Sequence, residues 1–305
     1  MSESPLGYSH PLYAASYAEL GEPRHLPRSG GWILQRAIPG NDSFDAMGCY
    51  PLFACRDWRG LEADLAELAD LVCLSAVTDP LGDYTPEILR RCFGAVCIPF
   101  KQHFVADLTR PREEFVASHH RRNARKALAL AIVEEAECPA TWADDWVRLY
   151  GHLIERHSID NFTTFSPRIL AAQLRVPGMH VFRALVDGAV AGMALWLAQG
   201  NAAYYHLAAY NDAGYRSRVS FALFWSAFGY FAERGVMRLS LGAGAGVQGS
   251  ADDGLTRFKQ GWSTGTKTVY LCGRILDESA YARLAQGLGD ATTRYFPQYR
   301  SGEFG

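Results

Sequence analysis

The sequence predicts an α/β protein with a mixed α+β sheet, because strand-like and helix-like segments alternate along most of its 305 residues. Residues 181–210 read as three consecutive strands, and residues 219–235 read as a buried helix that leads into another strand. The first 108 residues show a looser version of this alternation, without a residue-level repeat. Both halves therefore predict a sheet with helices packed on it.

The three consecutive strands are separated by Asp187-Gly188 and by Gly200-Asn201. Such pairs adopt the positive φ angles of tight hairpin turns, and the flanking segments carry the β-branched and aromatic residues that suit strands. This pattern predicts an antiparallel three-strand meander.

The segment VSFALFWSAFGYFAERG follows the meander and has apolar residues on nearly every face, as a buried helix does. Gly235 can adopt the left-handed conformation that ends a helix. The sequence predicts a strand at residues 237–241, a short helix at residues 255–262 and a last strand at residues 269–272.

The N-terminal half has its own signals. Residues 71–77 are apolar enough for a central strand, and Thr85-Pro86 predicts the start of a helix. We expect two further short strands at 95–99 and 103–108.

The overall charge gives no reason to expect nucleic-acid binding. Thirty Lys and Arg side chains against 32 Asp and Glu give a net charge of −2. No overall field therefore attracts nucleic acid, so DNA is not an expected partner and any RNA contact must be local.

The seven cysteines include no CxxC pair, and several lie in apolar segments, as buried thiols do. No metal site is expected. The N-terminus lacks the pattern of a signal peptide, and no apolar run approaches 18 residues, so no membrane span is expected. These features favour a cytoplasmic location.

One charged block lies between the two halves. Four of its residues place four positive charges within six positions: Arg121, Arg122, Arg125 and Lys126. On a helix, the first and third of these share a face, and so do the second and fourth. The block is either a solvated helix whose charges are offset by flanking glutamates, or a phosphate-contacting patch for tRNA or a pyrophosphate-bearing substrate.

The order of elements, together with the stretches AGMALWLAQGNAAYYHLAAYN, LGAGAG and GLTRFKQGW, resembles the GNAT superfamily. These stretches look like the branch that contains the Fem family, which transfers amino acids from aminoacyl-tRNA. The resemblance implies two tandem GNAT-like lobes, which we expect at residues 1–110 and 111–305.

GNAT enzymes that use coenzyme A carry an Arg/Gln-x-x-Gly-x-Gly/Ala loop that cradles the pyrophosphate at a helix start. The corresponding stretch here is NDAGYRSRVSFAL. Counted from Arg216, the glycine positions hold Val219 and Phe221; counted from Arg218, they hold Phe221 and Leu223. The cradle is missing in both registers. The two arginines would still bind a phosphate by charge, or else only solvate the start of a buried helix.

GLTRFKQGW is the most specific motif in the chain. In Fem-like proteins a Phe-Lys pair of this kind lies close to the reacting centre, so the resemblance implies catalytic roles for Phe258 and Lys259. Forming an amide from an ester requires positive charge or hydrogen-bond donors at the developing oxyanion. Lys259 would supply that charge and Phe258 would shape the pocket. In the alternative interpretation, Phe258 is plain core and Lys259 faces water.

Acceptor-side groups in GNAT enzymes lie on the third strand of the meander. Tyr204 and His206 share one face of that strand. His206 would accept the amine proton near neutral pH, or else it is a core histidine bonded to the backbone. Asp253, in the glycine-rich loop that follows, is a weaker candidate for holding the ammonium group of the acceptor.

The sequence therefore predicts a cytoplasmic acyltransferase, without metal or bound cofactor, that moves an aminoacyl or acyl group onto a primary amine. Aminoacyl-tRNA, contacted at its acceptor stem, is the favoured donor, and a peptidoglycan precursor or small peptide the favoured acceptor. Two alternatives are an acyl-CoA-dependent N-acyltransferase and a non-catalytic binding protein on a GNAT scaffold.

Overall fold

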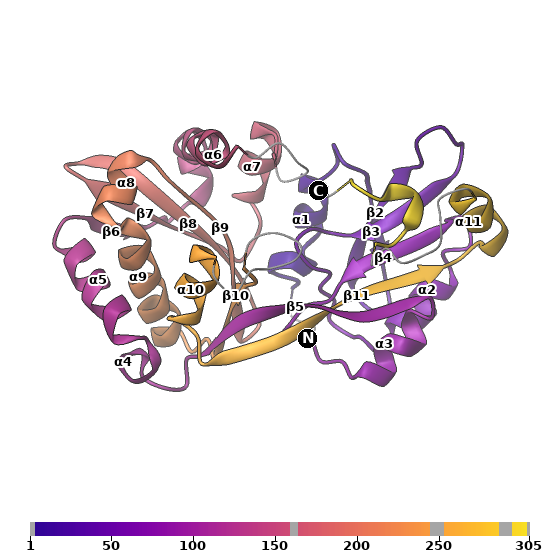
Figure 1. Cartoon of the computed structure of the whole chain (residues 1–305), viewed down its shortest axis with the longest axis horizontal. Coiled ribbons are helices and arrows are strands. Elements are labelled where there is room, and N and C mark those ends of the chain that lie inside the picture. Colours follow the sequence, from indigo (N-terminus) through magenta and orange to yellow (C-terminus); the bar gives the residue numbers. More distant parts are fainter. Residues whose placement is uncertain (1–3, 159–163, 245–252, 287–294, 304–305) are drawn as a thin grey trace. The chain divides into compact units, whose positions relative to one another are not determined.

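The computed structural model of the chain describes residues 4–158, 164–244, 253–286 and 295–303 (Figure 1). It forms two compact units. Unit 1 consists of Met1–Gly7 and Gln102–Lys267, and unit 2 of Tyr8–Lys101 and Thr268–Gly305. This division differs from the expected one at residues 110 and 111, because the last strand of the chain pairs with a strand of the N-terminal half.

The sheet of unit 2 mixes parallel and antiparallel pairs. Its strands, in spatial order, are β1 (Glu22–Leu26), β2 (Gly31–Ala37), β3 (Phe44–Gly48), β4 (Cys73–Val77) and β11 (Gly265–Ile275). β3 and β4 are parallel, and the other neighbours are antiparallel. The accompanying helices are α1 (Pro11–Ser16), α2 (Leu61–Ala66), α3 (Pro86–Cys92), α11 (Glu278–Ala285) and the 3-10 turns Gly7–Ser9 and Gln298–Arg300. Thr85 caps α3 through a bond from the amide of Ile88, which confirms that predicted helix start.

The sheet of unit 1 contains the predicted meander. Its strands, in spatial order, are the part of β5 (Val96–Asp107) from Gln102 onward, β10 (Arg238–Gly242), β9 (Ala202–Tyr210), β8 (Ala189–Gln199), β7 (Met179–Val186) and β6 (Ile132–Glu135). β9 and β10 are parallel, and the other neighbours are antiparallel. Asp187 and Gly188 have φ angles of 51° and 78°, which confirms the predicted hairpin turn between β7 and β8.

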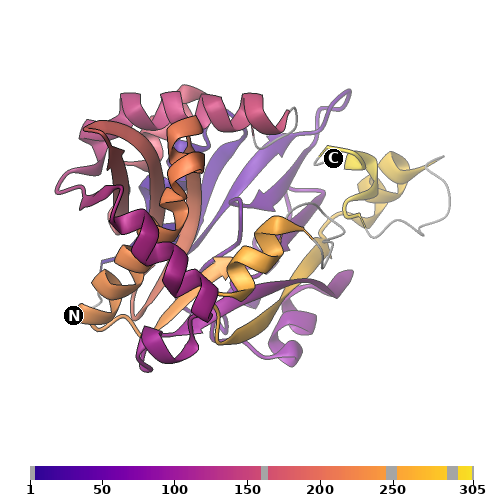
Figure 2. The ribbon, with the colours of Figure 1, turned by 60° about the vertical axis from the view of Figure 1, so that its left-hand side comes forward.

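Helices pack on both faces of the unit 1 sheet (Figure 2). They are α4 (Arg112–Phe115), α5 (Ser118–Leu128), the 3-10 turn Pro139–Trp142, α6 (Ala143–His157), α7 (Pro167–Gln173), α8 (Asp212–Ser217), α9 (Val219–Glu233) and α10 (Gly254–Gln260). α5 lies alongside α9, while α6 and α7 lie against the other face of the strands. The predicted α/β class, with mixed sheets in two lobes, is confirmed.

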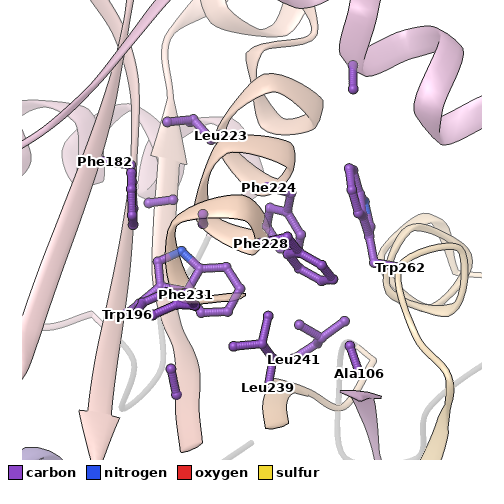
Figure 3. Packing of buried hydrophobic residues seen from close by; sticks show 14 of the residues in the cluster. Ala106, Phe182, Trp196, Leu223, Phe224, Phe228, Phe231, Leu239, Leu241 and Trp262 are labelled. Atoms are coloured by element: carbon purple, nitrogen blue, oxygen red, sulfur yellow. The ribbon is translucent and has the colours of Figure 1, made fainter. Parts of the chain in front are cut away.

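The main core of unit 1 lies between α9 and the sheet. Trp196 of β8 packs against Phe224 of α9, with ring centroids 5.4 Å apart. Trp262, just after α10, packs against Phe228 with centroids 5.3 Å apart and covers the same helix from another side (Figure 3). Because α9 is surrounded by apolar partners, its apolar residues are buried on several faces, and the predicted buried helix is confirmed.

Several elements differ from the sequence prediction, among them β1, β3 and α11, which were not predicted. β5 is one strand of 12 residues and not two short ones, and it continues through Pro99. α8 was not predicted, because its six residues are too few to show helical periodicity. β6 was not recognised either, because its four residues follow the charged helix α5 with little change in composition.

No helix in the described part of the chain is both long and apolar enough to cross a bilayer. All seven cysteines are free thiols. Within residues 4–158, 164–244, 253–286 and 295–303, no cluster of three or more His, Cys, Asp or Glu side chains is placed to bind a metal ion.

Candidate active site

A pocket of about 400 Å³ opens at the N-terminal end of α9. α8 ends at Arg218, whose φ of 56° turns the chain sharply so that α9 begins at the next residue. The start of a helix carries partial positive charge, so this pocket suits an anionic group. It is lined by Asn123, Tyr210, Gly214, Tyr215, Arg218, Ser220 and Phe221.

Of the two arginines predicted here, only Arg218 lines the pocket. Its Nη1 donates a hydrogen bond of 2.8 Å to Oδ1 of Asn123 on α5, which links α5 to the start of α9. Arg216 lies on α8 and is exposed. The structure therefore separates the two candidates: Arg218 faces the pocket, and Arg216 lies outside its lining.

The positions at which a coenzyme A enzyme carries glycines are occupied by core side chains. Val219 and Leu223 are fully buried. The ring of Phe221 packs against that of Phe258, with centroids 5.2 Å apart. The start of α9 is thus held by apolar packing and lacks the glycines of a pyrophosphate cradle.

The predicted basic block forms α5, whose inward face is buried through His120, Ala124 and Ala127. The outward face carries the charges: three of the four predicted basic residues are exposed and Arg121 is half-buried. The exposed ones are Arg122, Arg125 and Lys126. Asn123 of the same helix lines the pocket, so the basic face begins at the edge of the pocket.

Three of the four glutamates that flank this block pair with other groups. Glu113 bonds to Arg112 at 3.2 Å, and Glu134 bonds to Arg183 at 2.9 Å. Glu135 lies 3.1 Å from Nδ1 of His180. Within the described residues, none of the ion pairs includes Arg122, Arg125 or Lys126. Direct ion pairs therefore do not support, for these three residues, the interpretation in which the flanking acids offset the bases.

Lys259 is buried, with 6% of its surface exposed, so the alternative in which it faces water is wrong. Its Nζ donates a hydrogen bond of 2.6 Å to the carbonyl of Ala243, just beyond β10. The same Nζ lies 5.5 Å from the ring centroid of Tyr205 on β9. Phe258, the preceding residue, packs on Phe224 of α9 with centroids 4.8 Å apart. The structure places a cation between β9 and β10 and an aromatic wall beside it.

His206 does not lie beside Lys259. The pairing of β8 with β9 shifts by one residue here, because Trp196 opposes Tyr205 while Leu195 opposes Leu207. The ring of Tyr205 packs on Phe224 of α9, with centroids 4.8 Å apart. On the other face of the sheet, the Nε2 of His206 lies 3.0 Å from Oε1 of Gln173 on α7.

Burial also lowers the pKa of His206 to about 3, so its imidazole is neutral at pH 7 and a weak base. The sequence predicts that this residue accepts the amine proton near neutral pH, together with Lys259. The pKa argues against that role, and the two side chains lie on opposite faces of β9. Tyr204 is buried on the face of His206.

Asp253 is the N-terminal cap of α10. Its Oδ1 accepts bonds from the amides of Leu255 (2.6 Å) and Thr256 (2.9 Å), and its Oδ2 accepts one of 2.5 Å from the hydroxyl of Thr256. The carboxylate is committed to starting the helix, so the predicted contact with an acceptor ammonium is not supported. Residues 245–252 of the same glycine-rich loop lie outside the described residues.

Sequence reasoning missed most of the pocket lining and the buried His120. The segment NDAGYRSRVSFAL lacks the expected glycines, yet it supplies five of the seven lining residues through other side chains and backbone. The remaining two, Asn123 and Tyr210, come from α5 and β9. No sequence signal marks them, because they meet only through the fold.

Comparison with known proteins fits this geometry. Residues 116–260 match the family model described as an acetyltransferase (GNAT) domain. Unit 1 carries a GNAT acyltransferase domain. The GNAT match begins just before α5 and ends with α10, so it includes the pocket, the basic face and Lys259.

Solved structures extend the similarity in fold beyond the GNAT domain. FemX is 14% identical, with a TM-score of 0.69 over 91% of this chain and 94% of that chain. The C-terminal domain of a protein named as a putative lysylphosphatidylglycerol synthetase from Agrobacterium fabrum is 17% identical, with a TM-score of 0.59 over 90% and 89%. L-PGS from Bacillus licheniformis is 14% identical, with a TM-score of 0.52 over 90% and 93%. No curated protein sequence matches the chain.

Proposed function

We propose that this protein transfers an aminoacyl group from aminoacyl-tRNA to a primary amine in the cytoplasm. The proposal rests most on the exposed basic face of α5, which begins at a pocket on the start of α9. In the described part of the chain, its three exposed bases form no ion pair with the neighbouring glutamates. Such a face suits a polyanion larger than a single nucleotide, because several phosphates can be contacted in a row. The fold shared with FemX supports the same reading, since the Fem family uses aminoacyl-tRNA.

In this reaction the amine attacks the ester carbonyl of the aminoacyl group, a C–N bond forms, and the C–O bond to the ribose breaks. Negative charge develops on the carbonyl oxygen, and a preorganised cation stabilises it most effectively where water is excluded. Lys259 fits this role, because its ammonium is buried and is held by the carbonyl of Ala243. The amine gives up a proton as the C–N bond forms, and the departing ribose oxygen takes up a proton and leaves as a hydroxyl, so that the step balances.

Donor choice is the direct test of this proposal. The protein is incubated with labelled aminoacyl-tRNA, or with labelled acyl-CoA, and a panel of primary amines including peptides and peptidoglycan precursors. We expect label from aminoacyl-tRNA to appear in an amide product. Transfer from acyl-CoA alone would contradict the tRNA assignment, and transfer from neither donor would contradict the proposed function.

The basic face is tested by charge reversal in the double variant Arg122→Glu/Arg125→Glu. We expect weaker tRNA binding and a salt dependence whose slope falls by about one for each phosphate that the variant no longer neutralises. Arg175→Glu is the matched control, since Arg175 is an exposed arginine of unit 1 outside α5. Equal affinity and slope in the double variant and the control would remove α5 from the donor site.

An acyl-CoA-dependent N-acyltransferase is the second candidate, and the position of the pocket favours it. The start of α9 together with Arg218 suits the pyrophosphate of a nucleotide without any need for α5. This candidate predicts that acyl-CoA at 100 times its Kd stabilises the protein by about 2.7 kcal/mol. Melting that is unchanged by acetyl-CoA and by longer acyl-CoA would exclude it.

A further inference from the structure

His120 lies on the inward face of α5, with only 2% of its surface exposed. Its Nε2 is 2.9 Å from the backbone carbonyl oxygen of Phe258 on α10. A carbonyl only accepts hydrogen bonds, so Nε2 must carry the proton and donate it. The bond joins two helices through residues 138 positions apart in the sequence.

The carbonyl that receives this bond lies at the end of α10. In a continuing helix the amide of Trp262 would bond to Phe258, but it bonds instead to the carbonyl of Lys259, at 3.1 Å. The last carbonyls of a helix need partners from outside it. His120 is such a partner, and it acts one residue before Lys259.

Gly261 shows how closely the imidazole fits. A Cβ at this position would lie 2.2 Å from Cε1 of His120 and 2.5 Å from its Nε2. Gly261 itself has a φ of −69°, which every residue adopts. The need for glycine here therefore comes from the ring of His120 and not from the backbone.

Other rings enclose the same imidazole. Phe221, which lines the pocket, and Trp262 lie with their centroids 5.1 and 5.3 Å from that of His120. Burial lowers the pKa of His120 to about 4, so the ring is neutral at pH 7 and acts through its geometry rather than its charge.

We propose that His120 is a positioning residue for Lys259: by holding the carbonyl of Phe258 it fixes the end of α10, and so connects the basic face of α5 to the buried ammonium. This inference rests on the proposed function, because it assigns a task to a residue that supports Lys259 in transfer. The bond to Ala243 fixes the ammonium at one end of the lysine side chain, and His120 fixes the backbone at the other.

Two substitutions at position 120 separate the hydrogen bond from the packing. His120→Leu keeps an apolar filler and removes the donor, and His120→Gln restores an N–H group at a similar reach. We expect kcat to fall about 10- to 100-fold in the leucine variant, as for small misplacements of catalytic groups, with little change in the KM for the donor. The glutamine variant should recover most of that loss. His152→Leu, at an exposed histidine of unit 1 outside α5, is the matched control and should leave kcat unchanged.

Gly261→Ala tests the same contact from α10. The new methyl group collides with the imidazole, so we expect a fall in kcat similar to that of His120→Leu. In a chain that already carries His120→Ala the methyl group has room, and the second substitution should add little. Such non-additivity is characteristic of residues in direct contact. Fully additive effects would show that Gly261 and His120 act independently.

Hydrogen–deuterium exchange of the α10 amides provides a readout that does not need the substrate. We expect faster exchange in His120→Leu, near wild-type exchange in His120→Gln, and no change in His152→Leu. If wild-type protein transfers label from neither donor, the proposed function fails while the exchange result still decides whether His120 holds α10. Wild-type kcat and exchange in His120→Leu would overturn the proposal. If His120→Leu does not fold, the kcat values of His120→Gln and Gly261→Ala provide the same test. The proposal predicts a larger loss of kcat in Gly261→Ala than in His120→Gln, so equal losses in the two variants would also overturn it.

Discussion

The two units use buried charge in different ways. In unit 2, Asp45 is fully buried and accepts bonds from Arg300, at 2.6 and 3.0 Å, and from Tyr299 at 3.0 Å. In unit 1 the buried cation Lys259 is bonded to a backbone carbonyl, and the charges of α5 face solvent. Asp45 and Arg300 thus form a buried ion pair in unit 2, whereas Lys259 in unit 1 is buried against a backbone carbonyl, and we propose that it acts on a ligand. The contrast indicates where loss of charge should cost stability and where it should cost activity.

The largest expected effect on stability is in unit 2. Asp45→Ala removes the buried carboxylate bonded to Arg300 and leaves Glu303, 3.5 Å from its Nη1, as a weaker partner. Breaking a buried pair in this way costs about 3–5 kcal/mol. We expect a loss of that size in the free energy of unfolding, measured by urea denaturation. Asp70→Ala, which breaks the partly exposed pair with Arg24, is the control and should cost about 0–1 kcal/mol. Equal losses would mean that the buried network of unit 2 does not hold its fold.

In unit 1, removing the buried charge of Lys259 should slow the reaction. Lys259→Met keeps most of the side-chain volume and removes the ammonium, and losing one oxyanion donor slows a reaction by about 10²–10³-fold. We expect this decrease in kcat for transfer, measured with the labelled donor, and little change in the free energy of unfolding. Lys267→Met, at an exposed position of unit 1, should leave kcat unchanged. Retention of wild-type kcat by Lys259→Met would remove Lys259 from the chemistry.

A smaller difference between the units should appear in how the free energy of unfolding changes at acidic pH. An unfolded histidine titrates near 6.5, but burial lowers the pKa of folded His206 to about 3. Between these values the unfolded chain holds a proton that the folded chain lacks, so stability falls as pH falls, by about 1.4 kcal/mol per pH unit. In unit 2 the ion-paired Glu67 and Asp70 have lowered pKa values, so their contribution is lost only at lower pH, below the ordinary carboxyl range.

Urea denaturation between pH 6 and 4 measures this dependence. His206→Gln should reduce the slope of unfolding free energy against pH by about 1.4 kcal/mol per pH unit. The exposed His152, replaced by Gln, should leave the slope unchanged. An unaltered slope in His206→Gln would mean that His206 is protonated in the folded protein.

Elements with strong local signals were predictable from the sequence. The turn at Asp187 and Gly188, the cap at Thr85 and the apolar helix α9 each depend on residues close together in the chain. β5 is one strand of 12 residues, although the sequence predicts two short strands at 95–99 and 103–108. Pairing with neighbouring strands is not visible in one segment alone, so the continuous strand could not be predicted.

In the candidate site, too, some residues were predictable from the sequence and others were not. Lys259 was identified through a short motif, and Arg218 through the segment that starts a helix. The contact of His120 with Phe258 was not predictable, because it joins residues 138 positions apart. The role expected for His206 failed for a related reason: a single-residue bulge and a partner on α7 decide what its imidazole contacts.

The division of the chain has a consequence for its synthesis. Unit 2 is completed by β11 and the residues that follow it, whereas its other strands are made among the first hundred residues. During translation the early strands of unit 2 therefore lack their last partner, β11, until all of unit 1 has left the ribosome. Since domains fold as units, the acyl-transferring unit should become protease-resistant first in arrested nascent chains, although most of it is translated later.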